Sequence, residues 1–153
     1  MANHHQVVWG MALCLGLVTC GGCTAVKTGT HLIASYEETA AKPPCQGPPA
    51  LVVEKAEVHP SKITPGQQLV SRIVYASCYG TPLKGKITRK VLHNGETMIA
   101  LPEALTYMPG TWALTAYIAI PLGAAPGGYR LETQMQAGAF RWHGTQTFEI
   151  IRE

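Results

Sequence analysis

The stretch GTWALTAYIAIPLGAAPGGYRLETQMQ, residues 110–136, decides the fold class of this chain. Apolar side chains alternate with others over residues 112–120, which is the period of two expected of a strand that buries one face. Pro121 ends this strand, and the breakers of residues 123–128 predict a turn. Alternation resumes over residues 129–136, where every second side chain is polar. The stretch therefore predicts two β-strands joined by a turn rich in proline and glycine.

Five further segments are predicted as strands from their alternation and from the turn residues between them. They are residues 50–58, 67–77, 84–93, 96–101 and 141–151. Asn94-Gly95 is the strongest short hairpin signal, because a type I′ turn requires positive φ at both central positions. Residues 102–110 are expected to cross over to the stretch quoted above. About seven strands result, at the spacing typical of a β-sandwich.

The composition favours one sheet-rich domain of ordinary size. Charged residues make up 14% of the chain, well below the usual value of about 25%, whereas Gly (16) and Pro (11) are plentiful. The length of 153 residues leaves no room for a second domain once an N-terminal segment is subtracted. Because all 9 acidic residues are glutamates, the aspartate-dependent triad, the aspartic dyad and the EF-hand loop are excluded.

The N-terminal sequence MANHHQVVWGMALCLGLVTCGGC has the pattern of an export signal, with a polar start and an apolar run followed by small residues. It resembles a bacterial lipoprotein signal, in which small residues precede a cysteine that is diacylated and begins the mature chain. The resemblance implies that residues 1–22 are a signal peptide and that Cys23 is lipidated, with Cys20 as the alternative. If Cys23 is acylated, the mature chain keeps two free thiols, Cys45 and Cys78, which can pair. If Cys20 is acylated, Cys23 remains as a third thiol without a partner.

An uncleaved membrane helix is the alternative for the same segment. Residues 7–26 carry no formal charge and are long enough to cross a bilayer of about 30 Å, and no Lys or Arg precedes the apolar run. The glycines and cysteines at its end favour the lipoprotein. Both alternatives predict an anchored domain facing the periplasm or the exterior of a bacterial envelope.

Residues 23–49 are predicted as a tether, and residues 50–153 as the domain. Prolines dominate the end of the tether, which favours an extended, semi-rigid spacer. Its residues 31–39 are compatible with a helical turn or with an edge strand. Cys45 in the tether and Cys78 in the domain are predicted to form a disulfide, because the leader directs the chain to an oxidising compartment.

Several short motifs resemble bacterial immunoglobulin-like modules of the fibronectin III kind. They are Val58-x-Pro60, Thr64-Pro-Gly66, Gly110-Thr-Trp112, Ile120-Pro-Leu122 and Ala125-Pro-Gly-Gly-Tyr129-Arg-Leu131. The resemblance implies an immunoglobulin-like antiparallel β-sandwich in which Tyr129 makes a corner hydrogen bond at the start of the penultimate strand. Such modules serve as adhesins, enzyme accessory domains and assembly factors, so the fold does not choose a function.

No catalytic or metal-binding pattern stands out in the sequence. Cys20-Gly-Gly-Cys23 has CxxC spacing, but it closes an apolar leader and lacks the helix start that activates a redox pair. The histidines of the exported chain stand singly, without the HxH or HExxH spacing of a metal site. They are His31, His59, His93 and His143. We expect no catalytic residue, no metal and no cofactor.

Lysines line one face of the strand predicted at residues 84–93. Lys84, Lys86 and Lys90 share this face, and Arg89 stands behind them. A stripe of one sign can bind anionic lipid head groups, a polyanionic glycan or an acidic protein. The alternative is a solvated face whose lysines discourage sheet pairing. Nucleic acid is not expected, because the leader exports the chain and no aromatic stacking platform accompanies the charges.

These observations predict a lipid-anchored, non-catalytic envelope protein that acts as a binding, structural or assembly module. Its expected partners are the membrane, through the anchor, and a protein or glycan of the envelope. The alternative function is an enzyme accessory protein or a copper carrier. A copper site would draw on scattered His, Cys and Met side chains, since soft and imidazole ligands suit copper. The methionines concerned are Met98, Met108 and Met135.

Overall fold

The structure is a computed structural model that describes residues 33–39, 45 and 47–152. In this part of the chain it contains nine β-strands and no helix. The strands are β1 (Ile33–Glu38), β2 (Leu51–His59), β3 (Lys62–Ile63), β4 (Gln68–Ser77), β5 (Leu83–His93), β6 (Glu96–Tyr107), β7 (Gly110–Ala119), β8 (Gly127–Ala137) and β9 (Phe140–Ile150). The all-β class predicted from the sequence is confirmed.

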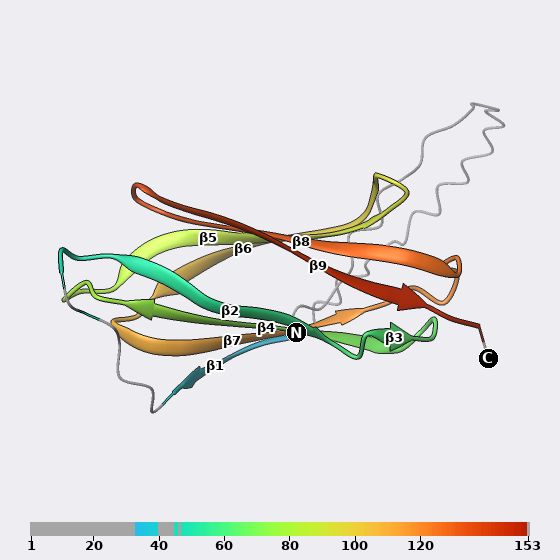
Figure 1. Ribbon diagram of the computed structural model, residues 1–153, viewed down its shortest axis with the longest axis horizontal. Coiled ribbons are helices and arrows are strands. Elements are labelled where there is room, and N and C mark those ends of the chain that lie inside the picture. Colours follow the sequence, from blue (N-terminus) through green and yellow to red (C-terminus); the bar gives the residue numbers. More distant parts are fainter. Residues whose placement is uncertain (1–32, 40–44, 46, 153) are drawn as a thin grey trace, which may run out of the picture.

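The strands form two sheets, which lie face to face as two layers (Figure 1). The four-stranded sheet has the order β1-β7-β4-β2, and the five-stranded sheet has the order β3-β9-β8-β5-β6. All pairings are antiparallel except the short parallel one between β3 and β9. β4 lies between β2 and β7, which agrees with the central position predicted for it.

The hairpin predicted at Asn94-Gly95 is confirmed, and it joins β5 to β6. The φ angles of these residues are 51° and 85°, as a type I′ turn requires. Two strands were not counted from the sequence. β1 lies within the predicted tether and pairs with β7 at the edge of its sheet, and β3 interrupts the predicted turn after β2. These strands are short and pair only with distant segments, so their sequences carry little alternation.

The two strands predicted within residues 110–136 are confirmed as β7 and β8, and their connection passes from the four-stranded sheet to the five-stranded sheet. One prediction about a connection is wrong. The predicted crossover at residues 102–110 is mostly strand, since β6 continues through Pro102 to Tyr107. Pro102 is tolerated because β6 is an edge strand, and a residue there can lack an N–H without losing a ladder hydrogen bond.

The core consists of two hydrophobic clusters, one toward each end of the sandwich. The first contains Leu69, Val91, Ile99, Ile118, Leu131 and Phe148, and the second contains Ile73, Ile87, Leu105, Leu114 and Met135, among others. Each of β4, β5, β6, β7 and β8 contributes to both clusters. In each of these five strands, one inward-facing residue separates the residues of the first cluster from those of the second, and this residue is polar or small. These residues are Ser71, Arg89, Glu103, Ala116 and Thr133.

No helix among the described residues is long and apolar enough to cross a membrane.

Candidate functional site

A shallow depression on the outer face of the five-stranded sheet is lined by cationic side chains. Lys84 and Lys86 of β5 and Arg141 of β9 line it, and its volume is about 270 Å³. Gln136 and Gly138 complete its floor and rim. We call this feature the cationic depression.

Lys84 and Lys86 point outward from the sheet because side chains alternate between the two faces of β5. Lys84, Lys86 and Lys90 alternate with the buried residues Ile87 and Val91, because successive side chains of a strand point to opposite faces. Lys86 stands opposite Gln136 of β8, and Gln136 stands opposite Arg141 of β9. Strand register therefore brings two cations to either side of one amide side chain.

Arg89 does not belong to this face, contrary to the sequence prediction. Its side chain is only 1% exposed, and it points between the two sheets. There its Nη1 lies 3.5 Å from Glu103 Oε2. Side chains alternate between the two faces of a strand, and Arg89 lies on the same inward face of β5 as Ile87 and Val91.

Lys90 lies on the predicted face but outside the cationic depression. It is half-buried, and its Cα partners across the sheet are Ala100 and Glu132. Strand register places Glu132 beside Lys90, so a negative charge lies next to the positive charge of Lys90. The cationic depression therefore consists of Lys84, Lys86 and Arg141, and not of the four residues expected.

Arg141 is the site residue that sequence reasoning missed. Its Nη1 donates hydrogen bonds to the carbonyl oxygens of Gly138, at 2.6 Å, and Phe140, at 2.7 Å. These bonds hold the guanidinium at the β8–β9 hairpin, where Gly138 adopts a φ of 55°. The Gly138-Ala139 turn was the sequence signal that could have paired the two strands and placed Arg141 beside Lys86.

The three cations of the depression have no carboxylate partner among the described residues. Among the described residues, ion pairs join Lys55 and Arg72 to Glu57, and Lys62 to Glu149. The hydrogen bond from Lys55 is the main cause that holds the pKa of Glu57 below its usual value. Within the same part of the chain Lys84, Lys86 and Arg141 form no ion pair, so their charge is available to an anion.

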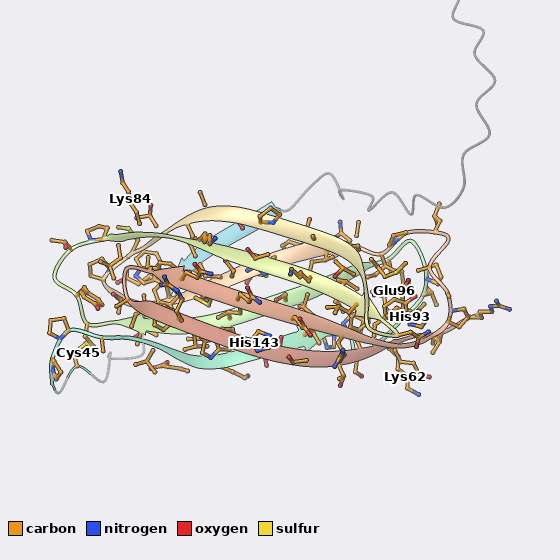
Figure 2. The ribbon with its side chains drawn as sticks, turned by 90° about the horizontal axis from the view of Figure 1, so that it is seen from above. Cys45, Lys62, Lys84, His93, Glu96 and His143 are labelled. Carbon is orange, nitrogen blue, oxygen red and sulfur yellow. A yellow bond between two sulfur atoms is a disulfide. The ribbon has the colours of Figure 1, made fainter. Side chains whose placement is uncertain are left out.

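The predicted disulfide lies at the same end of the sandwich. Cys45 and Cys78 are joined by a disulfide bond, and Cys78 donates its backbone N–H to the carbonyl of Ala50 at 2.8 Å. Figure 2 shows Cys45 and Lys84 at one end of the sandwich, and His93, Glu96 and Lys62 at the other. The disulfide therefore secures the connection before β2 at the end that carries the cationic depression.

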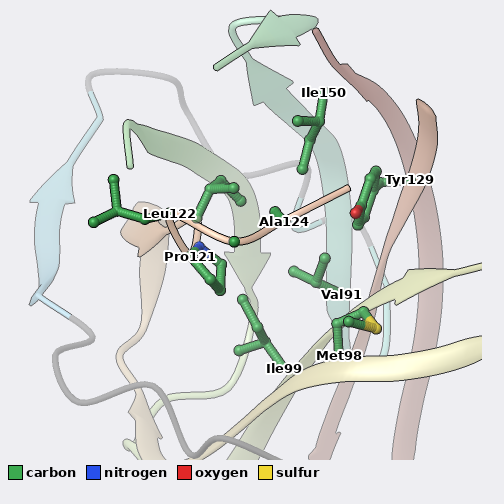
Figure 3. Close-up of a pocket in the computed structure, with 10 residues that line it drawn as sticks. Val91, Met98, Ile99, Pro121, Leu122, Ala124, Tyr129 and Ile150 are labelled. Carbon is green, nitrogen blue, oxygen red and sulfur yellow. The ribbon is translucent and has the colours of Figure 1, made fainter. Parts of the chain in front are cut away.

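The opposite end contains an apolar pocket of about 490 Å³. Figure 3 shows its lining, which comes from β5, β6, the β7–β8 connection and residues near Tyr129 and Ile150. Two apolar side chains at its mouth reach solvent, since Leu122 is 85% exposed and Met98 is 42% exposed. This pocket had no signal in the sequence, because it forms where residues 30 positions apart along the chain meet.

Tyr129 forms one wall of the apolar pocket and is held on three sides. Its hydroxyl donates a hydrogen bond to the carbonyl of Ala125 at 2.8 Å. Its ring stacks on His93, with centroids 4.3 Å apart, and on Phe148, at 5.5 Å. Burial raises the pKa of the Tyr129 hydroxyl, because the phenolate would lose its hydration.

The predicted histidines and methionines are dispersed. His93 packs on Tyr129 at the pocket end, His59 ends β2, and His143 lies on the outer face of β9. Met135 is fully buried in the core, whereas Met98 and Met108 reach the surface. In the described ranges no three His, Cys, Asp or Glu side chains gather in a metal-binding group.

His31 and the lipidation candidates Cys23 and Cys20 lie outside the described residues.

No protein-family model and no curated protein sequence matches this chain. Among solved structures, it is similar to the sporulation control protein Spo0M from Bacillus subtilis, with a TM-score of 0.50 and 10% identity over 68% of this chain and 50% of that one. A family 123 glycoside hydrolase from Clostridium perfringens gives a TM-score of 0.49 with 15% identity, over 60% of this chain and 22% of that one. The alkylpurine DNA glycosylase AlkC from Pseudomonas fluorescens also gives 0.49, with 16% identity, over 65% of this chain and 30% of that one.

The chain thus spans half or less of each of these proteins. At 10% identity, the similarity to Spo0M concerns the fold alone.

Proposed function

We propose that this protein is a lipid-anchored, non-catalytic module of the bacterial envelope that binds an anionic glycan through the cationic depression. The observation that carries the proposal is the convergence of Lys84, Lys86 and Arg141 on one concave surface without a carboxylate partner among the described residues. Lysine supplies mobile point charges, and arginine supplies a planar fork that binds carboxylate or sulfate in bidentate fashion.

A glycan suits this surface better than a protein does. Apart from the methyl group of Ala137, the side chains that line the cationic depression end in ammonium, guanidinium and amide groups. Among the described residues the exposed large hydrophobic side chains are Val52, Met98, Met108 and Leu122, and none of them lines the depression. Protein interfaces usually centre on buried aromatic or aliphatic side chains, whereas a charged and hydroxylated polymer needs cations and amides.

The direction of the chain also favours a ligand away from the anchoring membrane. Ile33 begins β1 opposite Tyr117, near the end of β7, and this end carries the apolar pocket. The described part of β1 therefore begins at the end opposite the cationic depression, which supports a ligand on the side away from the proposed anchor.

The sandwich is proposed to be immunoglobulin-like, as the sequence motifs imply. Two observations support this assignment. The hydrogen bond from the Tyr129 hydroxyl to Ala125, at 2.8 Å, has the form of the tyrosine corner of such folds. After β2, at the edge of one sheet, the chain passes to the short β3, which pairs with β9 of the other sheet, so one segment of chain spans both layers of the sandwich.

The anchor is tested by metabolic labelling with an alkyne fatty acid. We expect the full-length chain to carry the label and Cys23→Ser to lose it, because the thiol of Cys23 is the proposed acylation site. Cys20→Ser is the matched control and keeps the label. Loss of label in Cys20→Ser with retention in Cys23→Ser would transfer the anchor to Cys20, and an unlabelled wild type would refute the lipoprotein assignment.

Glycan binding is tested with dextran sulfate as a defined polyanion. We expect the triple variant Lys84→Gln, Lys86→Gln, Arg141→Gln to bind dextran sulfate at least about tenfold more weakly. Its affinity should also depend much less on salt concentration, because both properties reflect contacts between cations and the polyanion. The control is Lys55→Gln, Lys62→Gln, Arg72→Gln, which removes the same formal charge from cations that already have carboxylate partners. Equal losses in the two triple variants would show that only net charge matters and would refute the site.

A further inference from the structure

We infer that the apolar pocket beside Tyr129 receives an acyl chain, and that this chain is one of those carried by the protein's own N-terminal cysteine. The inference rests on the lipid anchor of the proposed function. It assigns a ligand to the end of the sandwich opposite the cationic depression.

The size and lining of the pocket fit a hydrocarbon chain. Its volume of about 490 Å³ lies in the range of about 300–1,000 Å³ that is usual for small-molecule sites. Val91, Ile99, Ile120 and Ile150 supply its walls, and all four belong to the buried core cluster at this end. A chain that enters the pocket is therefore in contact with the hydrophobic core itself.

The pocket offers few polar partners. Among its lining residues only Tyr129 has a side-chain oxygen or nitrogen atom, and that hydroxyl already donates to the carbonyl of Ala125. A peptide in this pocket would bring backbone N–H and C=O groups that need hydrogen-bond partners. A hydrocarbon chain needs none, so the lining favours an acyl chain over a peptide of this protein or of a second copy.

The mouth of the pocket is apolar as well. Leu122 stands at the rim and points outward, and Met98 lies on the other side of the opening (Figure 3). Their exposed fractions of 85% and 42% are costly in water but suit a surface crossed by hydrocarbon. An acyl chain entering between them would cover both side chains.

The N-terminal cysteine lies within reach of this mouth. Ile33 is the Cα partner of Tyr117, and Ile120, three positions further along the chain, lines the pocket. Cys23 precedes Ile33 by ten positions, and ten residues span at most about 33–36 Å. The acyl chains of Cys23 are therefore held near the pocket by a short connection, which raises their effective concentration there.

Occupancy of the pocket would weaken the anchor. A single acyl chain gives only marginal, reversible membrane binding, and stable anchoring takes a second signal. A diacylated cysteine with one chain in the pocket keeps one chain in the bilayer. The pocket therefore provides a means of loosening the protein from its membrane without cleavage.

The test uses full-length protein labelled in cells with a fatty acid that carries a diazirine and an alkyne. After irradiation, trypsin releases the lipidated peptide 23–27 and the peptide 91–130, which contains most of the pocket lining. We expect the two peptides to be cross-linked within one molecule. Mixing light and heavy isotope-labelled copies separates an intramolecular link from a link to a second copy.

Two variants and one control decide the outcome. Ala124→Trp fills the pocket, and Met98→Glu places a charge at its mouth while altering a surface residue, so each should lower the cross-link at least about fivefold. Ala104→Trp adds the same ring on the exposed face of β6, away from the pocket, and should leave the cross-link unchanged. The second pocket variant keeps the test decisive if the first fails to fold.

Each remaining outcome overturns the inference in a distinct way. A labelled protein whose label reaches only lipids, other peptides or a second copy refutes the pocket assignment and leaves the anchor intact. An unlabelled protein refutes the anchor and the pocket assignment together. An equal cross-link in Ala124→Trp, Met98→Glu and wild type shows that the chain lies elsewhere.

Discussion

Arg89 and Glu103 form an ion pair between the two sheets, with Nη1 of the arginine 3.5 Å from Oε2 of the glutamate. Arg89 is 1% exposed, whereas the Glu103 side chain is 25% exposed at the β6 edge. The pair stands where the two hydrophobic clusters of the core meet. The carboxylate partner stabilises a cation at this depth, since burying a charge away from water costs several kcal/mol.

The first prediction concerns this pair. Glu103→Ala should lower the free energy of unfolding in urea by about 1 to 3 kcal/mol, because it leaves Arg89 buried without its carboxylate. Arg89→Met should cost less, because Glu103 can turn toward solvent at the edge strand. The double variant Arg89→Met, Glu103→Ala should be more stable than Glu103→Ala alone. Additive losses in the double variant would show that the two side chains do not interact.

The second prediction concerns the disulfide between Cys45 and Cys78. Their sequence separation is 33, and closing a loop of that length stabilises a fold by roughly 3 to 4 kcal/mol in the chain-entropy model. Cys78→Ser should therefore clearly lower the melting temperature of the protein. Alkylation of the unfolded, unreduced wild type should modify neither cysteine; modification of both would refute the bond.

The third prediction concerns the hydrogen bond of the Tyr129 hydroxyl to Ala125. Tyr129→Phe should lower the free energy of unfolding by about 1 kcal/mol, because a partly buried hydrogen bond is lost while the ring contacts remain. Tyr79→Phe serves as the control, since among the described residues the Tyr79 hydroxyl has no such partner. Equal stabilities of wild type and Tyr129→Phe would show that the bond contributes nothing.

The fourth prediction is a pH dependence from the same hydroxyl. Burial raises the pKa of Tyr129 in the folded protein above its ordinary value of 10.0. Above about pH 10 the unfolded chain then binds fewer protons than the folded protein, so the free energy of unfolding falls as the pH rises. Below that pH this group has no effect. Urea unfolding between about pH 9 and 11 should show a shallower fall in Tyr129→Phe than in wild type.

The fifth prediction concerns the close contact of two strands at Gly85. A Cβ at this position would collide with the carbonyl oxygen of Gln136 and would lie 2.7 Å from Tyr107 Cε2. Gly85→Ala should therefore cost about 1 to 3 kcal/mol of stability, as overpacking usually does. Gly128→Ala is the matched control, because a Cβ there meets no atom within 4 Å. Equal melting temperatures of the two variants would contradict the predicted collision.

Local periodicity accounts for the parts of the fold that the sequence predicted well. In β8 the residues from Tyr129 to Met135 alternate between buried and exposed positions as expected, because each strand must bury one face whatever its partners are. The turn at Asn94-Gly95 was predictable for a similar reason, since only a few residue types accept positive φ. These signals are carried by neighbouring residues and need no knowledge of distant ones.

The candidate site was predictable only in part. Lys84 and Lys86 were found because they share the face of a single strand. Arg141 was missed because its place beside Lys86 depends on two successive strand pairings, β5 with β8 and β8 with β9. Arg89 was counted with the candidate binding residues although it stands behind the lysines in the alternation, and the structure buries it with Glu103.

The sequence by itself determined that the chain makes β-strands, where most of them lie and which cysteines pair, because alternation, turn residues and thiol count are local or compositional properties. The tertiary structure alone decided that β7 and β8 belong to different sheets, that Pro102 lies inside an edge strand and that an apolar pocket opens beside Tyr129. The physical reason is that sheet membership and cavities arise from contacts between residues far apart in the chain. Many partners satisfy the same alternation, and packing selects among them.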